Sequence, residues 1–329
     1  MYINQIFELS MVLDNEKFQK VLNRAYDKAD YLDKNGKEYV DLSLEAKGIV
    51  VIYRDSQYKK RIKLMVNAGL ILDCDNPDPV KLARKLDKRI GEYFDYKYQI
   101  EDFTLSGMIL STDIDVHNRE NILAYLKVLK RIGRVKGFSP LDYECFDGIG
   151  NFCLEGNSNG IEFLIYDLEN YVARQMWKTE RKELKSMLRE SEGILRTEVR
   201  LTKPKAIRNY TDAVDVSGQT VELIEKCQDI FLGIFTRIIP YGNFYKKDKA
   251  VEIIQRKVKD STLRRKMLRL VALIPEKKSL YLAQKEMNCR NIEKIMEEFA
   301  KINISPVTIS KRQEVKSLKN IYEYLLNEE

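Results

Sequence analysis

The stretch at residues 156–169, which reads GNSNGIEFLIYDLE, constrains the fold more than any other part of this chain. Its Asn and Gly residues form a turn signal, and the apolar run that follows is typical of a strand. The run ends at Tyr166 and Asp167. A tyrosine next to an acid at a strand end suits chemistry, but tyrosine is also an ordinary strand residue, so the stretch alone leaves both interpretations open.

Composition limits the class of protein. The chain has 329 residues, enough for two domains, and 33% of them are charged. No apolar run approaches the length of about 20 residues that a membrane-spanning helix needs, and the N-terminus has no basic region or cleavage site typical of a signal peptide. We therefore expect a cytoplasmic protein with no membrane partner.

Cysteine and histidine usage narrows the possible metal sites. The five cysteines are widely spaced and form no CxxC pair, so neither a zinc site nor a disulfide framework is expected. His117 is the single histidine, which excludes a His-pair site. A metal site would be built mainly from carboxylates, which suit Mg²⁺ or Mn²⁺.

Basic residues gather in three segments, at residues 127–136, 195–208 and 246–269. The third contains ten basic and three acidic residues, within a chain of net charge +7. Clustered positive charge is typical of contact with a polyanion. The alternative is that each segment is the solvated face of a helix or an edge strand.

The order of elements predicts an α+β fold. Strands are expected at residues 3–13, 38–44, 103–117 and 193–201, hairpins around residues 48–66 and 151–166, and helices between them, including a long one at 169–190. The first half reads strand, helix, strand, hairpin, helix, and the second reads strand, helix, hairpin, helix, strand, which suggests an internal duplication. We predict an antiparallel-sheet domain at residues 1–212 and a helical domain at residues 213–329.

Residues 279–302 in the second domain fit a helix-turn-helix unit. A short helix, a break at residues 288–291 and a second helix follow one another. Such a unit can place its second helix in the major groove of DNA. A plain helical hairpin has the same spacing.

Two strands carry polar side chains at alternate positions, which share one face of a sheet. Asp113, Asp115 and His117 are either a metal site or an exposed strand end. Arg196, Glu198 and Arg200 are either a surface salt-bridge ladder or a phosphate site, since arginine presents a bidentate fork to phosphate.

The motifs ILSTDIDVH, GNSNGIEFLIYDLE and GILRTEVRLTKPK, in that order, resemble those of the replication initiators of filamentous phages, the gene II proteins, and their plasmid relatives. The N-terminal segment KGIVVIYRDSQYKKRIKLMVNAG is also similar to a hairpin of that family, so the resemblance covers most of the chain. It implies an antiparallel-sheet nuclease domain and rolling-circle replication: a tyrosine attacks a phosphodiester at a DNA origin, stays linked to the 5′ phosphate, and later recloses the strand with the help of a divalent metal.

The resemblance also implies roles for particular residues. Tyr166 matches the nucleophile, and Asp115 and Glu198 match acids that hold or orient the metal, with Asp113 and His117 as further ligands. DNA contacts are implied for a set of basic residues: Arg196, Arg200, Lys203 and Lys205. Asp113 stands where the family has Arg, and Leu168 where a Lys follows the tyrosine.

The implied partner is origin DNA, single-stranded or supercoiled, with a host helicase and a second copy of the chain as further candidates. The departures from the family pattern leave two alternatives. One is a non-catalytic DNA-binding protein, either an origin binder or a regulator. The other is a conjugative relaxase, although a relaxase normally carries a histidine cluster that this sequence lacks.

Overall fold

The computed structural model describes residues 1–25, 29–32, 38–74, 78–142, 151–174 and 181–326. Its main feature is one sheet of ten strands in the order β2-β3-β4-β5-β1-β6-β10-β9-β8-β7, and every neighbouring pair is antiparallel. The predicted α+β class with an antiparallel sheet is confirmed. The strands are β1 (Asn4–Leu13), β2 (Ala29–Leu32), β3 (Glu38–Asp41), β4 (Ile49–Asp55), β5 (Lys60–Asn67), β6 (Thr104–Asp115), β7 (Phe138–Pro140), β8 (Asn151–Gly156), β9 (Ile161–Asp167) and β10 (Ile194–Leu201).

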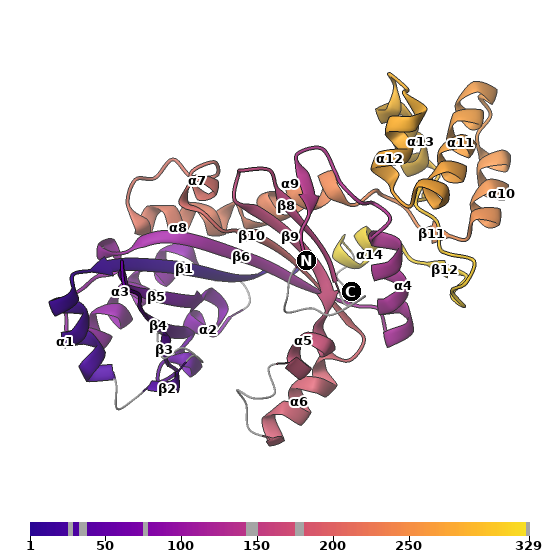
Figure 1. Ribbon diagram of the computed structural model, residues 1–329. Coiled ribbons are helices and arrows are strands. Elements are labelled where there is room, and N and C mark those ends of the chain that lie inside the picture. Colours follow the sequence, from indigo (N-terminus) through magenta and orange to yellow (C-terminus); the bar gives the residue numbers. More distant parts are fainter. Residues whose placement is uncertain (26–28, 33–37, 75–77, 143–150, 175–180, 327–329) are drawn as a thin grey trace.

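The two long strands β1 and β6 pair at the centre of the sheet (Figure 1). After β1 the chain forms a helix, strands β2 and β3, the β4–β5 hairpin and two further helices. After β6 a helix, strand β7, the β8–β9 hairpin and two helices follow in a similar order, and β10 is then added between β6 and β9. The first set of helices is α1 (Asn15–Ala25), α2 (Ala68–Leu72) and α3 (Pro79–Tyr93), and the second is α4 (Arg119–Leu129), α5 (Leu168–Arg174) and α6 (Arg181–Ser191). Part of the long helix predicted at 169–190 lies outside the described residues.

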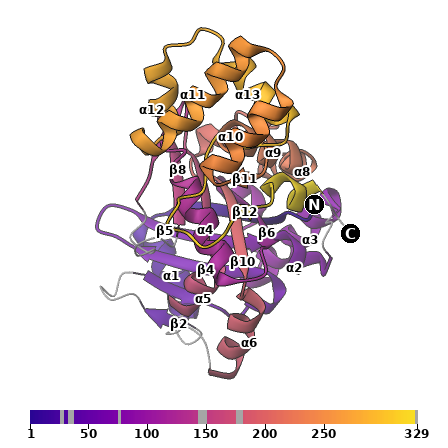
Figure 2. The same ribbon diagram turned by 90° about the vertical axis from the view of Figure 1, so that its right-hand side faces the viewer.

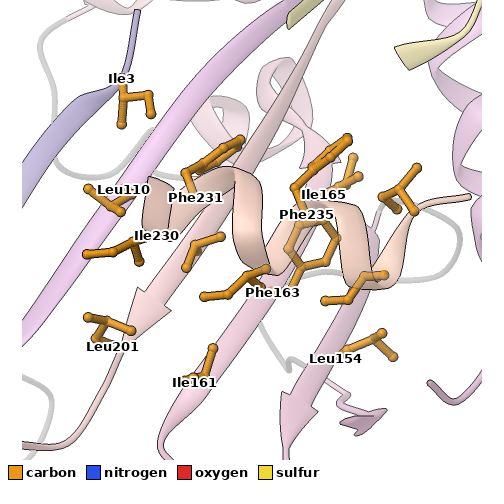
Figure 3. Packing of buried hydrophobic residues seen from close by; sticks show 14 of the residues in the cluster. Ile3, Leu110, Leu154, Ile161, Phe163, Ile165, Leu201, Ile230, Phe231 and Phe235 are labelled. Carbon is orange, nitrogen blue, oxygen red and sulfur yellow. The ribbon is translucent and has the colours of Figure 1, made fainter. Parts of the chain in front are cut away.

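One face of the sheet carries the core. Strand residues alternate between buried and partly exposed positions along β1, β4 and β5, as the period-two pattern predicts. Helices α8 (Val216–Glu225) and α9 (Cys227–Ile238) cover the second half of this face. Figure 3 shows Phe231 and Phe235 of α9 lying over strand residues, and the Phe163 and Phe235 rings meet edge to face at 5.9 Å.

The opposite face is covered only in part. Near the end of β9, α5 packs on it and α6 packs on α5. A small separate apolar cluster lies there, formed by Cys153, Leu164, Tyr166, Leu168 and Val172. Elsewhere this face carries partly exposed polar side chains from β1, β6 and β10. We call it the open face.

The C-terminal part is mostly helical. It contains α10 (Lys247–Lys257), α11 (Ser261–Lys277), α12 (Leu280–Met287) and α13 (Ile292–Lys301), which form a unit at one end of the molecule (Figure 1). The chain then pairs β12 (Ser317–Leu318) with β11 (Phe244–Tyr245), and α14 (Ile321–Leu326) returns to β6. The two helices predicted within residues 279–302 are present as α12 and α13.

The core crosses the predicted division at residue 212. Helices α8 and α9 pack on the sheet, and Tyr125 of α4 donates a hydrogen bond of 2.7 Å to the carbonyl of Lys319. Cutting the chain at residue 212 would expose this core, so the division into residues 1–212 and 213–329 stays a prediction. Among the described residues, no helix has the length and apolar character needed to cross a membrane.

Candidate active site on the open face

The register of three neighbouring strands aligns the predicted site residues. Arg196 of β10 lies opposite Tyr166 of β9 on one side and opposite Asp113 of β6 on the other. Glu198 and Arg200 follow at two-residue intervals, so their side chains project from the same face. The intervening residues of β10, namely Leu195, Thr197, Val199 and Leu201, are buried on the covered face, as the alternation predicts.

Tyr166 and Glu198 form a buried hydrogen bond at the edge of the open face. The Tyr166 hydroxyl donates to Oε1 of Glu198 at 2.5 Å, and Nε of Arg200 donates to the other carboxylate oxygen at 2.7 Å. Tyr166 is 1% exposed and Glu198 is 6% exposed. The sequence forms this contact because both residues occupy strand positions facing α5, whose Tyr171 ring lies 5.3 Å from that of Tyr166.

This environment keeps the Tyr166 hydroxyl protonated. Burial raises its pKa well above the ordinary value, because a phenolate is poorly solvated there, and the negative charge of Glu198 raises it further. Glu198 is also the acceptor placed to take the hydroxyl proton. A tyrosine hydroxyl within hydrogen-bond reach of a carboxylate is the arrangement of a nucleophile and its general base. A buried hydrogen bond that only stabilises the fold has the same geometry.

Arg196 and Asp113 form a bidentate pair beside this bond. Nε and Nη2 of Arg196 each donate to one carboxylate oxygen of Asp113, both at 2.7 Å. Partial burial opposes the charged form of Arg196, but the pair outweighs it and raises the guanidinium pKa. Asp113 therefore neutralises one of the two arginines that the sequence resemblance implies as phosphate contacts.

Asp115 and His117 lie apart from this group, at the end of β6. His117 has a left-handed backbone (φ 74°), and its amide donates to Oδ1 of Asp115 at 2.7 Å. Both side chains are largely exposed. Asp115 is opposite Ile194, four residues along β10 from Glu198, which separates the two acids by roughly 13 Å along the strand direction at 3.3 Å per residue.

The four predicted metal ligands do not converge. Both oxygens of Glu198 are engaged by Tyr166 and Arg200, and both oxygens of Asp113 by Arg196. Within the described part of the chain, no three carboxylate, imidazole or thiol side chains gather closely enough to hold a metal ion. Asp115 and His117 are the pair that remains, and strand spacing places the Asp115 backbone about 12 Å from that of Tyr166. The predicted Mg²⁺ or Mn²⁺ ligands thus do not fit one site beside the tyrosine.

Lys203 and Lys205 lie at the far end of β10. Both are exposed, and Lys203 directly precedes the short helix α7 (Pro204–Ile207). Both lysines follow Arg200 along the chain and lie further from Arg196. The structure therefore brings together Tyr166, Arg196, Glu198, Arg200 and Asp113, and it leaves Asp115, His117, Lys203 and Lys205 outside that group.

Sequence reasoning did not anticipate the cleft beside Arg196 and Asp113. This cleft has a volume of about 590 Å³, and its other walls come from the N-terminal half of the chain and from α14. They include Tyr2 and Asn4 before and within β1, Asn67 and Asp73 around α2, and Tyr324. Short-range patterns hold no signal for such a site, because β1 and α2 reach it only through the pairing of β1 with β6.

A scan against protein-family models and a search of curated proteins both gave no match for this chain.

Proposed function

We propose that this protein is a rolling-circle replication initiator that nicks and rejoins one DNA strand through Tyr166. The observation that carries the proposal is the hydrogen bond of 2.5 Å between the Tyr166 hydroxyl and Glu198. It is flanked on the same strand by Arg196 and Arg200, at the positions expected for phosphate contacts. The motif order around Tyr166 supports the same assignment.

In the proposed reaction, Glu198 removes the proton from Tyr166 as the phenolic oxygen attacks the phosphorus of a phosphodiester. The bond from phosphorus to the 3′ oxygen breaks, and that oxygen takes the proton from Glu198 to become a free 3′-OH. The enzyme is left joined to the 5′ phosphate through a phosphotyrosine. The reverse sequence, with a 3′-OH as the nucleophile, reseals the strand.

The arginines stabilise the charge that develops on the phosphate. A phosphodiester next to Tyr166 would compete with Glu198 for Arg200 and with Asp113 for Arg196, because guanidinium groups bind phosphate and carboxylate in the same bidentate manner. Access requires α5 to move away from Tyr166, since that helix packs over the ring. Because the predicted ligands do not form one site beside Tyr166, the steps above are written without a divalent ion. An ion that took part would have to enter with the DNA.

The second candidate is a DNA-binding protein without nuclease activity, acting at an origin or as a regulator. The burial of Tyr166 favours it, since a side chain that is 1% exposed meets no phosphate in this conformation. In that case the bond between Tyr166 and Glu198 fixes α5 to the sheet.

A cleavage assay separates the two candidates. The full-length protein is incubated with single-stranded and supercoiled DNA that flanks its gene, with Mg²⁺, with Mn²⁺ and with a chelator, and denaturing gels report nicking and covalent adducts. The matched control is Tyr53→Phe, which removes another buried tyrosine hydroxyl, bonded to Tyr93 at 2.7 Å. We expect Tyr166→Phe to abolish the adduct and keep DNA binding, and Tyr53→Phe to retain both.

The absence of any adduct from the wild-type protein under all of these conditions would refute the nuclease proposal in favour of the non-catalytic one. An adduct that persists in Tyr166→Phe would refute the assignment of the nucleophile. Activity that is lost with the chelator would show that a metal enters the site with the DNA.

A further inference from the structure

The strongest basic segment of the chain, residues 246–269, forms α10, a three-residue connection and the first half of α11. These two helices lie at the outer end of the molecule, on the right in Figure 1, and Figure 2 views the molecule from that side. The candidate active site on β9 and β10 does not include them. Their concentrated charge is therefore unexplained by the chemistry at Tyr166.

Helix α11 has two distinct faces. Met267, Leu270, Val271 and Ile274 are buried and attach it to the rest of the helical unit. On the opposite side, spacings of three and four residues place an exposed stripe along the helix. From the N-terminal end, this stripe consists of Thr262, Arg265, Arg269 and Ala272.

Among the residues that the structure describes, the two arginines of this stripe have no acidic partner. No salt bridge among the described residues involves Arg265 or Arg269. On the neighbouring α10 and the connection to α11, Arg256 and Lys259 are also exposed. A helix 17 residues long spans about 26 Å. The major groove of DNA admits a helix and presents guanine acceptors that an arginine binds with two hydrogen bonds.

Helix α13, the second helix of the unit predicted at residues 279–302, is less suited to DNA. Its exposed and partly exposed charges include three glutamates and two lysines. Moreover, Ile292, Glu293, Met296 and Glu297 line a cleft of about 680 Å³ whose other wall is formed by residues 132–136 and 236–240. One side of α13 thus faces the protein across this cleft, and its exposed Glu293 and Glu297 carry negative charge that opposes contact with DNA phosphates.

We propose that α11 is the helix that enters the major groove of duplex DNA, with Arg265 and Arg269 contacting base edges and Arg256 and Lys259 contacting phosphates. The inference rests on the proposed function only in taking DNA as the partner. It assigns duplex recognition to α11, separately from the tyrosine chemistry, and it does not assign that role to α13.

The test measures binding of the full-length protein to a duplex of the flanking DNA and to a random-sequence duplex by fluorescence anisotropy. Arg265→Ala/Arg269→Ala is expected to weaken binding to the flanking duplex about tenfold or more and to reduce the preference for it over random sequence. Arg256→Ala/Lys259→Ala is expected to weaken both equally and to reduce the slope of log affinity against log salt by about 2.

The matched control is Lys285→Ala/Lys301→Ala, which removes two exposed charges from α12 and α13. It is expected to change affinity less than about twofold. Circular dichroism checks that every variant is folded. Unchanged affinity in Arg265→Ala/Arg269→Ala, a larger loss in the lysine control, or no duplex binding by the wild type would overturn the proposal. So would an equal loss on double-stranded RNA, whose narrow major groove a helix cannot enter.

Adduct formation on single-stranded DNA, measured in the same variants, keeps the two proposals separate. If the wild type forms no adduct yet binds duplex DNA through α11, the nuclease proposal fails and the recognition role of α11 stands. If adducts form and the α11 variant binds duplex DNA as the wild type does, the recognition role fails and the nuclease proposal stands.

Discussion

The hydrogen bond between Tyr166 and Glu198 offers a test of the site that needs no substrate. Replacing Tyr166 with Phe keeps the ring in its apolar cluster and removes only the hydroxyl that donates to the carboxylate at 2.5 Å. Glu198 keeps its bond to Arg200, so no buried charge is left without a partner. A hydrogen bond to a charged group contributes about 1.5–3 kcal/mol, and we expect Tyr166→Phe to lower the free energy of unfolding by that amount.

Tyr53→Phe is the comparison that isolates the contribution of the negative charge on the Glu198 acceptor. The Tyr53 hydroxyl bonds to that of Tyr93 at 2.7 Å, and Tyr93 keeps its own bond of 2.6 Å to Asp41 when Tyr53 is changed. Both variants therefore lose one buried hydroxyl and leave the partner with another bond. Because the partner of Tyr53 is neutral, the expected cost is about 0.5–1.5 kcal/mol.

Urea unfolding followed by circular dichroism measures both variants against the wild type. The midpoints should fall in both, with the larger fall for Tyr166→Phe and with unchanged slopes. Equal costs, or a smaller cost for Tyr166→Phe, would refute the interpretation of Glu198 as a charged acceptor for this tyrosine. In a double-mutant cycle with Glu198→Gln, the coupling energy should account for most of the difference.

Three further predictions use the same unfolding assay. Because burial raises the pKa of Tyr166 above its ordinary value of 10.0, its contribution to stability is complete below pH 10. Above that pH the tyrosine ionises in the unfolded chain but not in the folded one, so the free energy of unfolding falls by up to about 1.4 kcal/mol per pH unit. Tyr166→Phe should make this alkaline loss of stability shallower. An unchanged loss would contradict the assignment. Gly193→Ala should cost about 1–3 kcal/mol, since its backbone is left-handed and a Cβ would lie 2.9 Å from the carbonyl carbon of His117; a neutral result would mean that this corner adjusts freely. A double-mutant cycle on Arg196 and Asp113 should give a coupling of about 0.5–1 kcal/mol, because the pair is partly exposed, and no coupling would count against the bidentate contact.

Local patterns predicted much of the fold. The turn residues before Ile161 and the alternation along β10 specify a strand each, because a strand with one buried face repeats every two residues whatever surrounds it. The same alternation placed Arg196, Glu198 and Arg200 on one face. Helices α12 and α13 were likewise indicated by their apolar spacing.

Long-range pairing decided what the patterns left open. The sequence separates Asp113 from Arg196 by 83 residues, and only the register of β6 against β10 joins them. The same register places Asp115 four residues along from Glu198, so two acids that lie within neighbouring sequence motifs do not share a site. A strand motif fixes the face of a side chain but not its position along the neighbouring strand.

The sequence by itself therefore determined the elements, their faces and the candidate residues, since each depends on neighbours within a few positions. Tertiary structure alone decided that Tyr166 is buried against Glu198 beneath α5, that Asp113 neutralises Arg196, and that one side of α13 faces the protein while α11 faces outward. These outcomes depend on which surfaces meet when strands pair and helices pack. Those surfaces are contributed by segments far apart in the chain, so the physical interactions that decide the site exist only in the folded molecule.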